Sequence, residues 1–170
     1  MITTLLFLAA VASVDSDPLA RARSGEAQCL SPDVLFKTCV SLEHYFATGP
    51  GTYINRGENL VDYNRPIVME TSVPVQVKGR AVCGTVRSAY VLGGKVSVAG
   101  RPLPREQAAA HLARFNKRLS SILGKEACSV YEPTDGGMYK IKATIAGVRR
   151  PELDSVFKWV KPSDGYTVAP

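Results

Sequence analysis

The sequence predicts one α+β domain, an antiparallel sheet of about five to seven strands with one long amphipathic helix packed on one face. Three observations support this. Short segments in which apolar and polar residues alternate recur between turn-forming residues. Only one stretch has helical periodicity. The chain has 170 residues, of which 45% are hydrophobic, enough for one core. Closure of the same strands into a β-barrel is the alternative.

The first 14 residues are typical of a secretory signal peptide. The apolar run from Ile2 to Val14 is too short to span a bilayer, and it ends in small residues that suit cleavage. We expect residues 15–28 to form a disordered tether and residues 29–170 to form the domain. A hydrophobic N-terminal strand or helix docked on the core is the alternative. The expected location is therefore periplasmic or extracellular, with no transmembrane segment.

The four cysteines of the mature chain predict disulfide bonds, because no two of them form a Cys-x-x-Cys motif and their number is even. Three pairings are possible. We favour Cys29–Cys39, which would fix the tether to the first strand, together with Cys83–Cys128, which would link a strand to the segment after the long helix. Four buried free thiols are the alternative, and they would suit a protein that is not exported.

Extended segments make up the first half of the domain. Residues 36–48 are predicted to form the first of them and to end at the turn in residues 49–51. Residues 52–66 are polar and mixed, which predicts a loop or a short irregular strand pair. Valine alternates with other residues in 67–79, which predicts a strand, and Pro74 favours an edge position for it.

Two hairpins are expected in the second half of the domain. The first joins residues 81–92 to residues 95–100 through paired glycines, which tolerate the positive φ angles of a tight turn. The second joins residues 127–133 to residues 138–147, whose apolar residues alternate with polar ones and so predict one solvated face.

The long helix is predicted over residues 104–123, because proline stands at its first turn and Gly124 follows its end. Residues 153–159 suit a short helical or strand segment that closes over the core, and residues 163–170 are expected to be loose. The helix carries one apolar stripe that should lie on the sheet, made of Ala108, Leu112, Phe115, Leu119 and Ile122/Leu123.

Motifs of common enzyme classes are absent from the sequence. It contains no G-x-S-x-G elbow, no phosphate-binding G-x-x-x-x-G-K-[ST], no H-E-x-x-H and no EF-hand loop. The chain has only two histidines, so one chain cannot build a metal site from several imidazoles. We therefore expect no cofactor and assign no catalytic residue.

The segment between Glu43 and Asp62 holds the greatest variety of polar residues. His44, oriented by Glu43 or Asp62, would be the base of a small cell-envelope hydrolase, although no nucleophile at a telling spacing accompanies it. A protruding loop over residues 47–59 would instead suit an inhibitor of a secreted enzyme. The simpler interpretation is a solvated loop with a surface histidine.

Positive charge is concentrated in the second half of the chain, where residues 80–170 carry 15 basic and seven acidic side chains. We therefore expect a non-catalytic exported module that binds an anionic envelope component or an acidic protein. We do not expect nucleic acid to be the partner outside the cell, and a merely solvated basic surface is the alternative. The basic residues expected opposite the apolar stripe, and hence the candidate binding residues, are Arg114, Lys117, Arg118 and Lys125.

Overall fold

The computed structural model describes residues 17–170 and shows a predominantly β protein. The predicted signal peptide, residues 1–14, lies outside the described residues. Within residues 17–170, no helix combines the length and the apolar character needed to cross a membrane.

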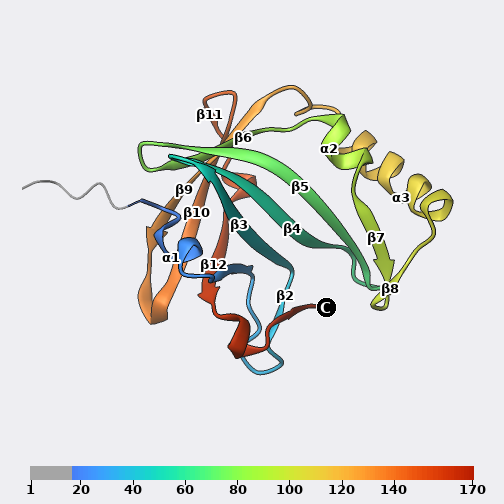
Figure 1. Cartoon of the computed structure of the whole chain (residues 1–170), viewed down its shortest axis with the longest axis horizontal. Helices are drawn as coiled ribbons and strands as arrows, with labels where there is room; N and C mark the ends of the chain where they lie inside the picture. Colours follow the sequence, from blue (N-terminus) through green and yellow to red (C-terminus); the bar gives the residue numbers. More distant parts are fainter. Residues whose placement is uncertain (1–16) are drawn as a thin grey trace, which may run out of the picture.

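Eight antiparallel strands form a closed barrel (Figure 1). Each strand pairs with the next one around the ring, and β1 pairs with β12 to close it. Closure gives every strand of the ring a partner strand on both sides, with one short gap along β5. In chain order the eight strands are β1 (Ala27–Leu30), β3 (Ser41–Gly49), β4 (Thr52–Asp62), β5 (Ile67–Lys78), β6 (Ala81–Thr85), β9 (Glu126–Pro133), β10 (Met138–Ile145) and β12 (Ser155–Val160).

The predicted open α+β sheet is therefore wrong, and the barrel that we kept as the alternative is the observed arrangement. The main reason is β4, an 11-residue strand in a segment that we expected to be a loop or a short irregular strand pair. This strand pairs with β3 on one side and β5 on the other. Its inward positions include Asn55, Gly57 and Asn59, so the apolar alternation of an ordinary core strand is missing.

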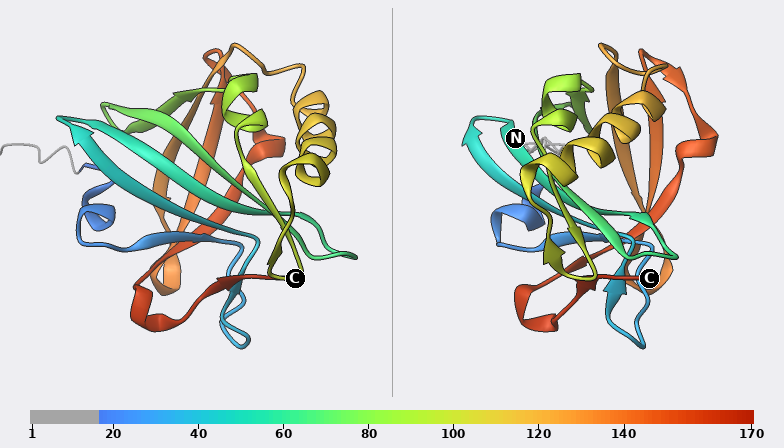
Figure 2. Two further views of the ribbon diagram at one scale, coloured as in Figure 1. Left: turned by 45° about the vertical axis from the view of Figure 1, so that its right-hand side comes forward. Right: turned by 90° about the vertical axis from the view of Figure 1, so that its right-hand side faces the viewer.

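The chain between β6 and β9 leaves the barrel and forms two helices and a small hairpin. These elements are α2 (Ser88–Leu92), β7 (Lys95–Val98), β8 (Arg101–Pro102) and α3 (Arg105–Arg118). Helices α2 and α3 lie together beside one opening of the barrel (Figure 2), and β7 extends the sheet from the first residues of β5.

The predicted long helix is shorter than expected, because α3 ends at Arg118 and residues 119–124 form turns. It packs against α2 and, through Ala108 and Leu112, on the short β5–β7 pair beside the barrel. The predicted long helix on one face of the main sheet is therefore wrong. The predicted strand 81–92 is also wrong in part, since only Ala81–Thr85 is extended and Ser88–Leu92 is helical. Leu112 of α3 is buried against Met69 and Val96.

Pro74 lies between the part of β5 that pairs with β7 and the part that pairs with β6. Strand β5 pairs with β7 over Ile67–Glu70 and with β6 over Val75–Lys78. Between these stretches only β4 is paired with it, so the missing N–H of proline is tolerated there. The predicted strand is confirmed, but it is an edge only over this short gap.

Residues 17–28, which we expected to belong to a disordered tether, are ordered. They form α1 (Ala20–Arg23) and the start of β1. Leu19 is fully buried, in contact with a cluster of side chains inside the barrel. The segment therefore closes the barrel on the side away from α2 and α3 (Figures 1 and 2).

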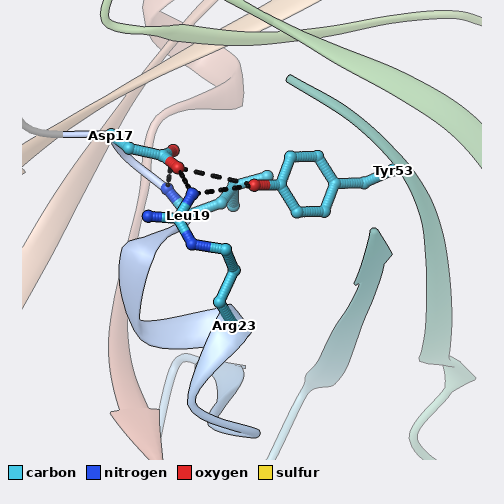
Figure 3. Close-up of polar contacts among 4 residues, drawn as sticks. All are labelled: Asp17, Leu19, Arg23 and Tyr53. Atoms are coloured by element: carbon cyan, nitrogen blue, oxygen red, sulfur yellow. Dashed lines mark hydrogen bonds and ion pairs between the residues drawn. The ribbon is translucent and has the colours of Figure 1, made fainter. Parts of the chain in front are cut away.

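Polar contacts hold this closing segment against β4 (Figure 3). The Leu19 amide donates to Asp17 Oδ1 at 2.9 Å, and the Asp17 carboxylate pairs with the Arg23 guanidinium. Arg23 also donates to the Tyr53 hydroxyl at 3.2 Å. One end of the barrel is thus closed by Leu19 and sealed by a charged cluster around the Tyr53 hydroxyl.

The C-terminal residues, expected to be loose, pack on the outside of the barrel. Strand β13 (Thr167–Val168) pairs in parallel with β2 (Thr38–Cys39). Tyr166 and Val168 cover an outer apolar cluster that includes Leu42 and Val160. The remaining short elements are β11 (Val148–Arg149) and the 3-10 turns η1 (Asp135–Gly137), η2 (Pro151–Leu153) and η3 (Pro162–Asp164).

Both favoured disulfides are confirmed. Cys29–Cys39 joins β1 to β2 with a Cα separation of 5.3 Å. Cys83–Cys128 joins directly opposed positions of β6 and β9, with a Cα separation of 4.1 Å. The second bond therefore crosslinks the two barrel strands between which the α2 to α3 insertion leaves and returns.

Aromatic side chains fill the half of the barrel next to α1. Phe157 is fully buried, with its ring centroid 5.0 Å from that of Tyr131, 5.1 Å from that of Tyr139 and 5.5 Å from that of Trp159. The predicted core position of Trp159 is confirmed, since it is 4% exposed. These rings fill only part of the interior, and the other part is hollow.

A candidate ligand-binding cavity in the barrel

A cavity of about 340 Å³ occupies the half of the barrel next to α2 and α3. Tyr45 and Tyr131 form its boundary with the aromatic cluster, because they line the cavity and also pack against that cluster. An eight-stranded barrel is just wide enough to be filled by side chains or to hold one small molecule. In this barrel, side chains fill the half next to α1, and the half next to α2 and α3 is hollow.

Most of the cavity wall is apolar. It combines inward residues of β5, such as Val73 and Val75, with side chains of the helical insertion and of the turns that follow α3. Phe115, Leu119 and Ile122 of the predicted apolar stripe line the cavity, whereas Leu112 packs on the β5–β7 sheet. The stripe therefore covers the barrel opening instead of a flat sheet.

The polar side of the cavity comes from β3, β4 and β9. Tyr45, Asn55, Asn59 and Tyr131 line it there. The Tyr45 hydroxyl donates to Gln28 Oε1 at 2.9 Å and lies 3.3 Å from the Tyr131 hydroxyl. Gln28 is 1% exposed, and among the described residues its Nε2 has no hydrogen-bond partner.

Glu43 lies directly behind this polar side. It is opposite Gln28 of β1 and Gly57 of β4 in the two strand pairs that flank β3. A Cβ at position 57 would overlap the Glu43 carboxylate, so glycine provides the space for that group. Ser41 Oγ is 2.5 Å from Glu43 Oε1 and 2.9 Å from Asn59 Oδ1.

Burial raises the pKa of Glu43, and the neighbouring carboxylate of Glu58 adds to the effect, while hydrogen bonds from Ser41 and Asn55 oppose it. The hydrogen bonding agrees with a proton on this carboxyl. Ser41 has one hydroxyl proton for two acceptors, and a protonated Glu43 supplies the second. Burial likewise raises the pKa values of Tyr45 and Tyr131, so both phenols stay protonated at neutral pH.

Replacing Glu43 with glutamine is expected to increase stability at neutral pH. The folded pKa of Glu43 lies above its unfolded value, so its contribution to stability falls as pH rises from the unfolded pKa to the folded pKa and is constant above it. The stability advantage of Glu43→Gln should therefore be absent below the unfolded pKa, about 4.3, and grow above it. Urea unfolding at a series of pH values measures this difference, and a constant difference would show that Glu43 ionises freely.

The predicted hydrolase residues do not come together. Glu43 and His44 are adjacent in β3, so their side chains point to opposite faces of the barrel wall. The His44 ring stacks on Phe46 instead, with the ring centroids 6.4 Å apart. Asp62 ends β4 and accepts hydrogen bonds from the Asn64 and Arg65 amides. This geometry leaves His44 without an orienting carboxylate from either predicted partner.

The loop predicted for an inhibitor is also absent, because residues 47–59 belong mainly to the β3–β4 hairpin. Among residues 17–170, the two most exposed large apolar side chains, Leu35 and Phe36, lie elsewhere, in the disulfide-bounded loop between β1 and β2. Val34, Leu35 and Phe36 are 64%, 82% and 73% exposed. The carboxylate of Asp33 accepts hydrogen bonds from the amides of Leu35 and Phe36 and thereby shapes this loop.

The predicted basic residues are all exposed, but they do not share one helix. Arg114, Lys117 and Arg118 belong to α3, whereas Lys125 lies beyond its end. None of the four takes part in an ion pair within residues 17–170. Arg114 and Arg118 border a small hollow together with Arg65.

One group of potential metal ligands occurs among the described residues, formed by Cys83, Cys128 and Glu126. The two sulfur atoms are bonded to each other. A thiolate is needed to bind a metal, so the intact disulfide removes two of the three ligands.

The polar segment that contributes to the cavity can be recognised in the sequence, but the cavity itself cannot. Glu43, Tyr45, Asn55 and Asn59 occupy odd-numbered positions and point inward, in alternation with outward residues such as Arg56. Polar residues thus occupy both the inward and the outward positions of these strands. This alternation was the sequence signal that could have revealed strands facing a polar interior. The chain matches no protein-family model, no curated protein and no solved structure.

Proposed function

We propose that this is an exported, non-catalytic binding protein that holds one small, mainly apolar molecule inside the barrel. The observation that carries the proposal is the hollow half of the barrel, with its apolar wall and a few polar groups on one side. Small-molecule sites commonly have this composition. Export is supported by the two disulfides, which persist in oxidising compartments.

The size of the cavity limits the ligand. About 340 Å³ accommodates a molecule of modest size, such as a short alkyl chain or an aromatic molecule of two or three rings. Each CH₂ group moved from water into the apolar wall contributes about 0.8 kcal/mol before the costs of association. A chain of about eight carbons therefore gains about 6 kcal/mol before those costs, so the polar groups on one side of the cavity must add to the affinity.

The neutral fluorophore N-phenyl-1-naphthylamine provides the test. We expect one saturable site, with a blue-shifted emission that reports an apolar environment. Val73→Trp places a large side chain into the cavity and should weaken binding by about tenfold or more. Val148→Trp is the matched control, because Val148 is 64% exposed on β11. Equal binding by both variants would place the fluorophore outside the barrel and overturn the proposal.

A second candidate function is contact of the basic face with an anionic envelope component or an acidic protein. The basic face is the exposed surface formed by Arg65 and by the α3 residues Arg114, Lys117 and Arg118. The observation that favours this function is that Arg65, Arg114 and Arg118 border one hollow with a single carboxylate, that of Asp62. Guanidinium groups suit paired hydrogen bonds to phosphate or carboxylate oxygens.

Heparin retention tests this second candidate. The triple change Arg114→Gln, Lys117→Gln and Arg118→Gln should lower the salt concentration needed for elution and leave folding intact, because all three side chains are exposed. The control is a triple change of equal charge at Arg80, Arg101 and Lys161, which are exposed elsewhere. If both triple variants lose equal retention, only net charge matters and the basic face is not a site.

A further inference from the structure

We propose that the molecule held in the barrel is an amphiphilic carboxylate, with its apolar body inside the cavity and its carboxylate at the opening, paired with the guanidinium of Arg87. This inference rests on the proposed function, because it assigns a chemical class and an orientation to the ligand of that cavity.

The first argument is the position of Arg87, which lies between β6 and α2. Among the described residues that line the cavity, Arg87 alone is exposed, and all the others are buried or half-buried. A residue that borders a cavity and is also in contact with bulk water lies where the cavity meets the solvent. Arg87 therefore marks the opening through which a ligand would enter.

The second argument is the charge of the cavity wall. Arg87 is the one charged residue that lines the cavity, and the rest of the lining is apolar or carries neutral hydroxyl and amide groups. Within residues 17–170, no ion pair involves Arg87. The planar guanidinium offers paired N–H donors that match the two oxygens of a carboxylate. The wall thus provides one cationic group, placed at the opening.

The third argument is the charge of the chain next to the opening. The amide of Val86, the residue before Arg87, donates to the carbonyl oxygen of Lys125 at 3.1 Å, so the segments that carry these two basic residues lie side by side. Lys125 is exposed as well. The carboxylate of Glu126, which follows it, already pairs with Lys78 at 2.5 Å. The local charge therefore attracts an approaching anion.

The inner end of the cavity determines the orientation of such a ligand. The polar side chains there, such as Tyr45, Asn55 and Tyr131, are neutral. A carboxylate placed among them would lose its water and gain no cation, which is costly. At the opening the same group keeps part of its hydration and gains the guanidinium of Arg87. The apolar body therefore lies inward, against side chains such as Val73.

A cationic ligand is disfavoured by the same geometry. Its ammonium group would meet a like charge at Arg87, and among the described residues no carboxylate lines the cavity to pair with it. A neutral alcohol would fill the same space but would gain no ion pair. The wall therefore predicts a preference for carboxylate over alcohol and for alcohol over amine.

The test uses three ligands of equal chain length, octanoate, 1-octanol and octylamine, each displacing N-phenyl-1-naphthylamine from the cavity. At pH 8 the carboxylate and the amine are both ionised. We expect octanoate to bind about threefold more tightly than 1-octanol and about tenfold more tightly than octylamine. These factors are modest, because an ion pair at an exposed arginine is partly screened by water.

Two replacements of Arg87 test its role. Arg87→Gln should lower octanoate affinity by about threefold and leave 1-octanol affinity nearly unchanged. Arg87→Glu should reverse the preference, so that octylamine binds more tightly than octanoate. The matched control is Arg80→Glu, because Arg80 is exposed in the turn between β5 and β6 and does not line the cavity. It changes the net charge equally and should keep the preference for octanoate. Circular dichroism spectra establish that the variants fold.

The location of the alkyl chain is tested by Val73→Trp, which fills the cavity and should weaken octanoate binding about tenfold or more. Octanoate binding that depends on Arg87 but survives Val73→Trp would place the anion on the outer surface and overturn the inference.

The outcomes separate this inference from the proposed function. If the fluorophore binds in the cavity but octylamine binds as tightly as octanoate, or if Arg87→Glu keeps the preference for octanoate, the proposed function stands and the carboxylate assignment is wrong. If neither the fluorophore nor any of the three ligands binds, both the assignment and the proposed function fail.

Discussion

Phe157→Ala is expected to lower the free energy of unfolding by about 3–5 kcal/mol, the usual cost of removing a buried phenylalanine. Phe157 is fully buried at the centre of the aromatic cluster, and its ring packs against those of Tyr131, Tyr139 and Trp159. Such pairs add to the cost of lost apolar burial, by about 0.5–1.5 kcal/mol each.

Urea unfolding of Phe157→Ala and of Val156→Ala measures this effect in two neighbouring side chains of β12. Val156 is 44% exposed, so its replacement should change stability by less than about 0.5 kcal/mol. Similar losses in the two variants would contradict the inward orientation of Phe157, and with it the register of β12 in the barrel.

Removing the Cys83–Cys128 bond, by changing both cysteines to alanine, should destabilise the protein by about 4 kcal/mol. The bond connects residues that are 45 positions apart. It therefore restricts the conformational freedom of the segment between β6 and β9 in the unfolded chain. It also holds together two barrel strands that no short hairpin connects.

The corresponding Cys29→Ala and Cys39→Ala double variant is the control. Its cysteines are ten positions apart, so the loop-entropy relation predicts a smaller loss of about 3 kcal/mol. Reversible urea unfolding without reductant compares the two double variants. A larger loss of unfolding free energy in the short-loop variant would contradict a stabilisation based on chain entropy. As an independent check, free-thiol titration of the denatured wild type should find no reactive thiol.

The sequence predicted individual elements better than their assembly. Strands β5, β9 and β10, the start of α3 and both disulfides follow from local signals, namely alternation, a proline at the first turn and cysteine number. Barrel closure depends on β4, and its inward positions are occupied by Asn55, Gly57 and Asn59. No apolar alternation marks such a strand, because its inner face borders a polar part of the interior.

The candidate site was predictable only in part, for a related reason. The segment from Glu43 to Asp62 was identified by its polar composition, but its two interleaved sets face opposite sides of one wall. Without β4 as a strand, His44 and Glu43 could be assigned to one site. Gln28 was assigned to a tether, because neither Leu19 nor the Asp17–Arg23 pair could be recognised as the closure of a barrel.

The binding cavity is tested most directly by methyl NMR of the protein titrated with N-phenyl-1-naphthylamine. We predict shifts of the methyl resonances of Val73, Val75 and Leu119, which line the cavity. We predict none for Val34 and Val148, which are exposed and do not line it. Shifts confined to the exposed valines, with the cavity methyl groups unchanged, would contradict a ligand site inside the barrel.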